Sequence, residues 1–383
     1  MKLLPFLAAG LVLPAAAFGS PAPAADEVRA IWVTRFEYQT EADVKTILAN
    51  CASLGFNTVL FQVRGQADAY YRSSIEPWAE RLGGRDPGFD PLEVACRESK
   101  RLGLSLHAWV NTMPAWRGKT PPADRNHVCY THPNWIVVGK DGRRQSFNDH
   151  YVCLNPCLPE VRDYIVSVLR DLAERYPIDG LHLDYVRFIE GEWSYDAKTL
   201  ALFGGSPEAQ PEAWNTFRKG AVTELVRQTR QMLKEMRPNA LLSAAVFPSA
   251  KSRERVLQDA EGWVRKGLID WVFPMTYDDS DADYRDVIDE GFALFRAGGR
   301  GRLLSSKAGQ PVEVAASKTI CFPGVGAYKH KTAEQTVRQM AMCRAGFAVF
   351  SYSSFYVSPD ETRRESEKLC RARREAVRKY LAR

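Results

Sequence analysis

The residues with the clearest potential for chemistry lie in the segment DGLHLDYVRF, residues 179–188. This segment is apolar enough for a buried strand, but it ends in one carboxylate, Asp184, followed by Tyr185 and Arg187. Burying an unpaired carboxylate is costly, so an acid at this point is expected where a strand opens into a cleft. A salt bridge of Asp184 with Arg187 or Arg64 is the structural alternative.

Asp184 needs a partner if it serves acid–base chemistry. Hydrolysis of a glycosidic bond uses two carboxyl groups, one with a raised pKa and one that stays ionised. We predict Asp184 as the first catalytic carboxylate and Asp278, just after a later β-rich run, as the second. Four further acids compete for the second position: Glu37, Asp68, Glu190 and Glu192.

The elements that must position these acids alternate regularly along the chain. Eight β-rich runs are expected, at residues 30–36, 57–63, 104–110, 179–186, 241–247, 270–277, 319–325 and 347–355. Amphipathic helical patterns follow them, at Asp43–Leu54, Pro91–Leu102, Glu160–Tyr176, Glu212–Met236, Arg255–Lys266, Ala282–Phe295, Ala333–Arg344 and Glu361–Leu381. Near-continuous apolar strands indicate a parallel sheet that is covered on both faces.

Eightfold strand–helix repetition predicts one α/β domain, a single (β/α)8 TIM barrel over residues 25–383. Two connections are too long for simple turns, at residues 112–158 after strand three and 189–211 after strand four. Connections of this kind lie at the carboxyl ends of barrel strands, where they shape the substrate cleft.

Polar and aromatic side chains gather near the carboxyl ends of the expected strands. Because strand residues alternate between faces, His107, Trp109 and Asn111 share one face of strand three. Aromatic residues on mouth loops can stack on the apolar face of a pyranose ring. The predicted substrate-binding residues are Gln62, Arg64, His107, Trp109, Asn111, Trp116, Tyr185, Arg187, Trp193 and Tyr277. For His107, a place in the barrel interior is an equal alternative.

Several other chemistries lack their sequence signals. The chain has no GxGxxG after the first strand, no serine nucleophile elbow, no HExxH and no cysteine-protease signature. His127 and His132 lie five residues apart without further ligands, which is a weak metal signal. No cofactor and no metal are therefore predicted.

The chain ends and the composition suggest an exported protein. Residues 1–24 combine an early lysine, an apolar run too short to span a bilayer and small residues typical of a signal peptide. No stable membrane anchor is expected. The eight cysteines are scattered, which does not suggest a disulfide scaffold, although Cys153 could pair with Cys157 or Cys129.

The net charge of +6 is concentrated near the C-terminus, in RRESEKLCRARREAVRKYLAR. A solvated helix face explains this charge, and attraction to an anionic cell-envelope polymer is the sharper alternative. Nucleic acid is disfavoured as a partner, because no basic patch is interleaved with aromatic residues.

An ordered set of segments resembles the glycosyl hydrolase-like family 10 of bacterial envelope proteins. The matching stretches are EVRAIWVTRF, GFNTVLFQVRGQADAYY, SSIEPWAERLGG, DPGFDPLEVACRESKRLGLSLHAWVNTM, HPNW, LNPCLPEVRDYIV, DGLHLDYVRF and DWVFPMTYD. The resemblance implies a (β/α)8 barrel with glycosidase activity. Characterised relatives in this family are thought to act on the glycan strands of peptidoglycan.

By position, the resemblance implies that Gln62 and Arg64 lie in the cleft. The family's strand-three motif matches His107, Trp109 and Asn111, and its strand-four acid matches Asp184. Many members carry a second aspartate directly after that acid, where this chain has Tyr185. The second carboxylate must then come from another segment.

We therefore expect an exported glycoside hydrolase that acts on a cell-envelope polysaccharide, first of all peptidoglycan. A carbohydrate-binding barrel without catalysis and a glycosidase for a scavenged glucan are the alternatives.

Overall fold

The computed structural model describes residues 27–291, 318–343, 346–357 and 365–382. The predicted signal peptide, residues 1–24, lies outside the described residues. Among those described, no helix combines the length and apolar character needed to cross a membrane.

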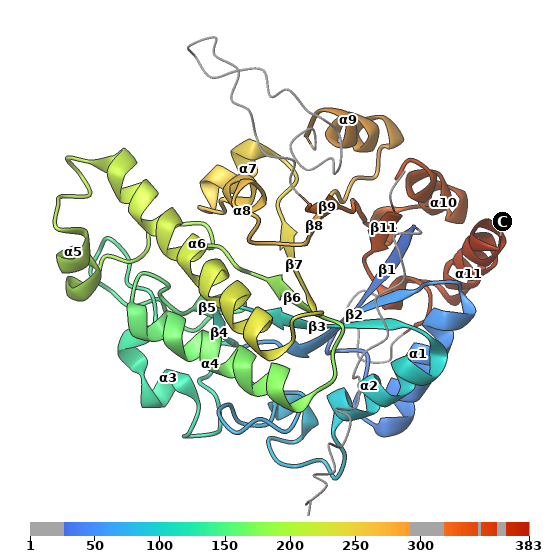
Figure 1. Cartoon of the computed structure of the whole chain (residues 1–383), viewed down its shortest axis with the longest axis horizontal. Coiled ribbons are helices and arrows are strands. Elements are labelled where there is room, and N and C mark those ends of the chain that lie inside the picture. The colour runs from blue at the N-terminus through green and yellow to red at the C-terminus, as the bar shows by residue number, and fades with distance from the viewer. Residues whose placement is uncertain (1–26, 292–317, 344–345, 358–364, 383) are drawn as a thin grey trace, which may run out of the picture.

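The structure is built on a parallel sheet that curls into a barrel, with helices around it (Figure 1). The sheet has the order β10-β11-β1-β2-β3-β6-β7-β8-β9. Its strands are β1 (Val28–Val33), β2 (Thr58–Arg64), β3 (Ser105–Asn111), β6 (Gly180–Asp184), β7 (Leu241–Val246), β8 (Trp271–Pro274), β9 (Ile320–Cys321), β10 (Gly324–Val325) and β11 (Gly346–Val349).

The two ends of the sheet are consecutive pieces of one stretch, because β9 pairs with β8 and β10 pairs with β11. Between them, Phe322 donates its backbone N–H to Val272 O (3.0 Å) and Pro323 O accepts from Ala348 N (3.1 Å). Pro323 has no N–H to donate, which explains why the seventh strand of the barrel is divided into β9 and β10. The strand closes the sheet, and the predicted (β/α)8 class is confirmed, with all eight strands in place.

The helices alternate with these strands as expected. They are α1 (Glu41–Ser53), α2 (Pro91–Leu102), α4 (Pro159–Arg175), α6 (Pro211–Met236), α7 (Ala250–Arg255), α8 (Ala260–Arg265), α9 (Asp281–Gly291), α10 (Ala333–Ala341) and α11 (Glu367–Leu381). The bounds predicted for α2 are correct, because Asp90 accepts the N–H groups of Leu92 (3.0 Å) and Glu93 (3.1 Å), and Gly103 ends the helix with φ +68°.

One helix prediction is wrong. The pattern predicted over Arg255–Lys266 is helical only in its second half, as α8 (Ala260–Arg265), because α7 ends at Arg255 and Leu257 then adopts a left-handed conformation (φ 53°). The C-terminal part of Ala282–Phe295 and the first residues of Glu361–Leu381 lie outside the described residues.

The two long connections are partly structured. The 112–158 connection contains a two-stranded antiparallel sheet of β4 (Pro114–Arg117) and β5 (Tyr151–Cys153), together with α3 (Val128–Thr131). The 189–211 connection contains α5 (Ala197–Phe203). Sequence patterns gave no sign of β4 and β5, because these strands are only three or four residues long. All eight cysteines are buried free thiols, so the suggested pairing of Cys153 is not formed.

Candidate active site

Asp184 is the last residue of β6 and pairs in register with Asn111, the last residue of β3. It is 8% exposed, and burial raises the pKa of its carboxyl group. Arg187 opposes that rise, as does the backbone N–H of Tyr185, which donates to Asp184 Oδ1 at 2.7 Å. Nearby Trp109 also favours the charged form slightly, although its buried indole N–H makes no well-formed hydrogen bond. A carboxyl group that resists ionisation at the carboxyl end of a barrel strand suits general acid catalysis.

The residues that follow Asp184 form an aromatic and cationic wall. Tyr185 has φ 50° and packs its ring edge-on against Tyr151, with centroids 4.9 Å apart. The Arg187 guanidinium lies over the rings of Tyr185 (4.4 Å) and Phe247 (4.7 Å). No carboxylate among the described residues forms an ion pair with Arg187 within 4.0 Å, so its charge acts on the site rather than on a fixed partner.

A hydrogen-bonded network joins the ends of the first three strands. Gln62 Nε2 donates to Asn111 Oδ1 (3.1 Å), and Asn111 Nδ2 donates to Gly65 O (3.0 Å) and to the Tyr151 hydroxyl (3.2 Å). Arg35, which follows β1, donates from Nη2 to the same hydroxyl at 3.1 Å. A Cβ atom at Gly65 would lie 2.6 Å from Arg35 Cζ, so only glycine leaves room for this guanidinium. The predicted residues Gln62 and Asn111 therefore meet near Asp184.

Tyr151 is the member of this network that the sequence did not reveal. It belongs to β5, inside the 112–158 connection, and no periodicity or motif marks it. Its hydroxyl joins Arg35, which follows β1, to Asn111, the last residue of β3, and its ring contacts Tyr185. A connection of this length folds back over the barrel rim and supplies a site residue that strand patterns cannot predict.

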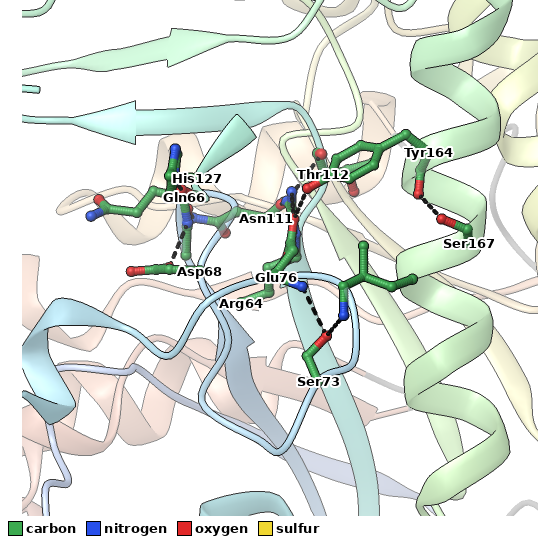
Figure 2. Close-up of polar contacts among 12 residues, drawn as sticks. Arg64, Gln66, Asp68, Ser73, Glu76, Asn111, Thr112, His127, Tyr164 and Ser167 are labelled. Carbon is green, nitrogen blue, oxygen red and sulfur yellow. Dashed lines mark hydrogen bonds and ion pairs between the residues drawn. The ribbon is translucent and has the colours of Figure 1, made fainter. Parts of the chain in front are cut away.

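Arg64 has a structural role, and its predicted contact with substrate stays a prediction. It is 1% exposed, and its Nε and Nη2 donate to both carboxylate oxygens of Glu76 at 2.7–3.1 Å (Figure 2). Its Nη1 donates to the backbone oxygens of Asn111 and Thr112, and Tyr164 donates its hydroxyl to Glu76 Oε1 at 2.7 Å. The Arg64–Glu76 pair thus fixes the end of β3 from inside.

Asp68 follows β2 by four residues and lies in the same close-up (Figure 2). It is 3% exposed, and burial raises the pKa of its carboxyl group, while Arg35 and His127 oppose that rise. Asp68 Oδ1 accepts the backbone N–H of Gln66 at 3.1 Å, and the His127 ring Nε2 lies 3.0 Å from Gln66 O. Nowhere in the described part do three or more His, Cys, Asp or Glu residues gather as a metal site would require. His127 belongs to this polar cluster through its contact with Gln66 O.

Three other predicted binding residues are interior. His107 is fully buried against the Trp271 ring (centroids 4.9 Å apart), and burial lowers the pKa of its imidazole to about 3. Trp109 packs in the barrel interior below Asp184, and Trp116 is buried with its Nε1 donating to Thr120 O at 2.7 Å. Contact of these three residues with substrate stays a prediction, since strand alternation gives the face of a residue but not its depth in the barrel.

The residues after β8 divide between the site and a turn. Tyr277 is partly buried, and burial together with the neighbouring Asp184 carboxylate raises the pKa of its hydroxyl. Asp278 Oδ1 accepts the backbone N–H of Ser280 at 2.8 Å, which is the geometry of a turn-capping aspartate. Its assignment as the second catalytic carboxylate stays a prediction.

The remaining candidates lie at the surface or are occupied. Glu190 and Glu192 have exposed side chains (70% and 65%) that pair with surface cations. Trp193 is partly buried and donates its Nε1 to Glu190 O at 2.9 Å. Glu37 accepts backbone N–H groups on both carboxylate oxygens, from Thr34 (2.6 Å) and from Ser353 (2.8 Å).

With this geometry in hand, comparison with known proteins gives the family. The family model described as glycosyl hydrolase-like 10 matches residues 27–291. The chain belongs to the glycosyl hydrolase-like 10 family. This membership supports a glycosidase-type function.

Two relatives of this family member carry names that agree with it. Glycosyl hydrolase YngK of Bacillus subtilis is 24% identical over 314 residues, which are 72% of this chain and 59% of YngK. Glycosyl hydrolase DigH of Escherichia coli is 27% identical over 248 residues, which are 58% of this chain and 55% of DigH. The matches span a little over half the length of each relative.

Solved structures support the fold of this family member. The PgaB (BpsB) glycoside hydrolase domain from Bordetella bronchiseptica superposes with a TM-score of 0.64 at 15% identity, covering 93% of this chain and 99% of that domain. Alpha-L-fucosidase isoenzyme 2 from Paenibacillus thiaminolyticus gives a TM-score of 0.59 at 12% identity, covering 93% of this chain and 49% of the fucosidase.

Proposed function

We propose that this family member is an exported glycoside hydrolase that cleaves a cell-envelope polysaccharide, with peptidoglycan glycan strands as the first candidate substrate. The observation that carries the proposal is Asp184, a buried carboxyl group with a raised pKa at the carboxyl end of β6. Glycosidic-bond cleavage needs an acid that still holds its proton near the working pH, and burial provides such an acid.

In the proposed reaction Asp184 donates its proton to the glycosidic oxygen as the bond from that oxygen to the anomeric carbon breaks. The leaving sugar departs as an alcohol. A water molecule adds its oxygen to the anomeric carbon and loses one proton, and Asp184 regains a proton from solvent. Developing positive charge on the sugar ring is stabilised by carboxylate charge in the site. Tyr151, which is partly exposed and held by Arg35 and Asn111, would position hydroxyl groups of the substrate.

Export and an envelope substrate have separate support. The first 24 residues have the composition of a signal peptide, and the net charge of +6 favours contact with an anionic polymer. The relatives YngK and DigH are named only as glycosyl hydrolases, so the choice of polymer belongs to this proposal. Fractionating cells that express the full chain would test export, and retention in the cytoplasm would contradict it.

The test compares Asp184→Asn with a matched control, Glu190→Gln. Both changes remove one carboxylate and keep its shape, but Glu190 is exposed and pairs with Arg255 at 3.0 Å. We expect the Asp184 variant to lose reducing-end release from purified glycan strands by at least 100-fold while it remains folded, and the Glu190 variant to match the wild type. Full activity in the Asp184 variant would refute the assignment.

A second candidate is favoured by one residue. Tyr185 occupies the position where many members of the family carry a second aspartate, which would suit a barrel that binds carbohydrate without cleaving it. Co-sedimentation of the wild-type chain with glycan strands, without any release of reducing ends, would support this alternative. A panel of chromogenic glycosides separates the envelope substrate from a scavenged glucan.

A further inference from the structure

We propose that Asp68 is the second catalytic carboxylate and that it acts as the general base of an inverting hydrolysis. The inference rests on the proposed function, because it assigns the second half of the same reaction. It departs from the sequence prediction, which placed Asp278 in that role and treated Asp68 as one competitor among four.

Asp68 is linked to Asp184 by the rim network. Arg35 interacts with Asp68 through its charge and donates a hydrogen bond to the Tyr151 hydroxyl at 3.1 Å. Asn111 donates to the same hydroxyl at 3.2 Å and pairs in register with Asp184. The two acids therefore stand at opposite ends of one set of polar groups along the carboxyl ends of β1, β2, β3 and β6.

The Asp68 carboxylate is largely unoccupied. Among the described residues, its one hydrogen bond is accepted by Oδ1 from Gln66 N at 3.1 Å, and no cation lies within ion-pair distance of the carboxylate. Figure 2 shows its carboxylate directed away from the Arg64–Glu76 pair, in which Glu76 is fully engaged. Buried carboxylates are normally paired or fully hydrogen-bonded. A carboxylate kept at 3% exposure without such partners has acceptor oxygens left for a water molecule.

Backbone strain occurs beside both acids. Among the described residues, Ala67 (φ 56°) and Tyr185 (φ 50°) are two of the four non-glycine residues with positive φ. Ala67 directly precedes Asp68, and Tyr185 directly follows Asp184. Left-handed conformations are unfavourable for such residues and gather where a site requires a particular side-chain direction. The same strain next to both carboxylates indicates that each one is held in place for a purpose.

Inversion follows from the roles of the two acids. A base that activates water on the face opposite the leaving group displaces that group in a single step, which inverts the configuration of the anomeric carbon. In inverting enzymes the two carboxyl groups lie about 6.5–9.5 Å apart, because the water molecule lies between the base and the sugar.

The proposed step balances as follows. Asp68 takes one proton from the water, whose oxygen forms a bond to the anomeric carbon on the face opposite the leaving group. Asp184 gives its proton to the departing oxygen, so the products are two sugar chains. Asp68 then returns its proton to solvent, and Asp184 regains one. Arg35 and His127 favour the ionised form of Asp68 that this role requires.

The experiment compares Asp68→Asn with Asp278→Asn in the full chain, on glycan strands that the wild type cleaves. We expect the Asp68 variant to lose 10²- to 10⁴-fold in kcat with little change in KM. It should also lose the acidic limb of the pH–rate profile. The Asp278 variant should lose less than threefold, and NMR of the first product should show the inverted anomer.

The controls separate possible failures. The Asn side chain can still accept the Gln66 N–H, and thermal melting with glycan co-sedimentation shows whether the Asp68 variant folds and binds. The groups that face Asp68 are Arg35, His127, Glu76, Tyr38 and Tyr70, of which only His127 ordinarily titrates near neutral pH, so His127→Gln identifies its share of the profile.

Three results would overturn the inference: a folded Asp68→Asn chain with wild-type kcat, a retained anomer, or loss of activity in Asp278→Asn alone. Each of these leaves the proposed function standing, provided that Asp184→Asn is inactive. An inactive wild type, or an active Asp184 variant, would instead remove the proposed function itself.

Discussion

The buried ion pair between Arg64 and Glu76 offers the most quantitative test of how this barrel supports its site. The Glu76 side chain is 0% exposed and that of Arg64 is 1% exposed. Replacing Glu76 with Ala removes three charge-assisted hydrogen bonds from Arg64 and the one from Tyr164. The guanidinium is then left buried without a counter-charge, which costs about 3–5 kcal/mol of unfolding free energy.

This loss converts into a measurable melting shift. An unfolding entropy of roughly 2 cal/mol/K per residue, over roughly 350 residues, means that each kcal/mol lowers Tm by about 1.4 °C. Glu76→Ala is therefore expected to melt about 4–7 °C below the wild type. The matched control is Asp86→Ala, which removes the exposed partner of Arg72 (3.1 Å; side chains 59% and 51% exposed) and should shift stability by less than about 0.5 kcal/mol.

Activity gives the second half of this test. Arg64 Nη1 holds the backbone oxygens of Asn111 and Thr112, so its role in positioning β3 is separate from its charge balance. The double variant Arg64→Met/Glu76→Leu should recover part of the lost stability but remain at least about 10-fold slower in kcat. A Glu76→Ala variant with the same Tm as the Asp86→Ala control would refute the stabilising role of the ion pair. A double variant with wild-type kcat would refute the role of Arg64 in positioning β3.

Three further outcomes are expected. Burial raises the pKa of Asp184 above its unfolded value, so folding favours the protonated form and the carboxyl group costs stability as pH rises through the folded pKa. The Asp184→Asn variant should thus unfold at a higher denaturant concentration than the wild type at pH 7, and the difference between the two midpoints should shrink towards pH ~3. Equal midpoints at pH 7 would contradict this expectation. Asp90→Ala should cost about 1–2 kcal/mol in urea unfolding, because it removes the α2 cap and the acceptor of the Tyr176 hydroxyl (2.5 Å); a loss below about 0.5 kcal/mol would count against it. Gly65→Ala should displace Arg35 and lower kcat more than it lowers Tm, and unchanged kinetics would show that Arg35 does not depend on this glycine.

The barrel could be predicted because its signals are local. Apolar runs of strand length and helical periodicity fix the type of each element, and caps such as Asp90 and Gly103 fix the ends of α2. The helix predicted from Arg255 begins only at Ala260, because Leu257 is left-handed and no glycine or proline signals that turn. Propensity patterns carry no information about such a conformation, because tertiary packing imposes it.

The site could be predicted only in part, for a geometric reason. Alternation puts His107, Trp109 and Asn111 on one face of β3, but only Asn111 lies at the strand end beside Asp184. Depth in the barrel depends on how neighbouring strands are staggered, which the register of one strand against another decides. Two residues that are two positions apart on one strand, such as Trp109 and Asn111, can therefore lie in the packed interior and at the rim respectively.

By itself the sequence determined which elements form and that Asp184 ends a strand, because hydrophobic period and residue type are written along the chain. The tertiary structure alone decided that Arg64 neutralises Glu76, and that Tyr151 and Asp68 join Arg35 at the rim. These contacts link residues 12 to 116 positions apart, and closing the barrel is what brings them together. The charge on a side chain is fixed by its type, but its partner is fixed by the fold.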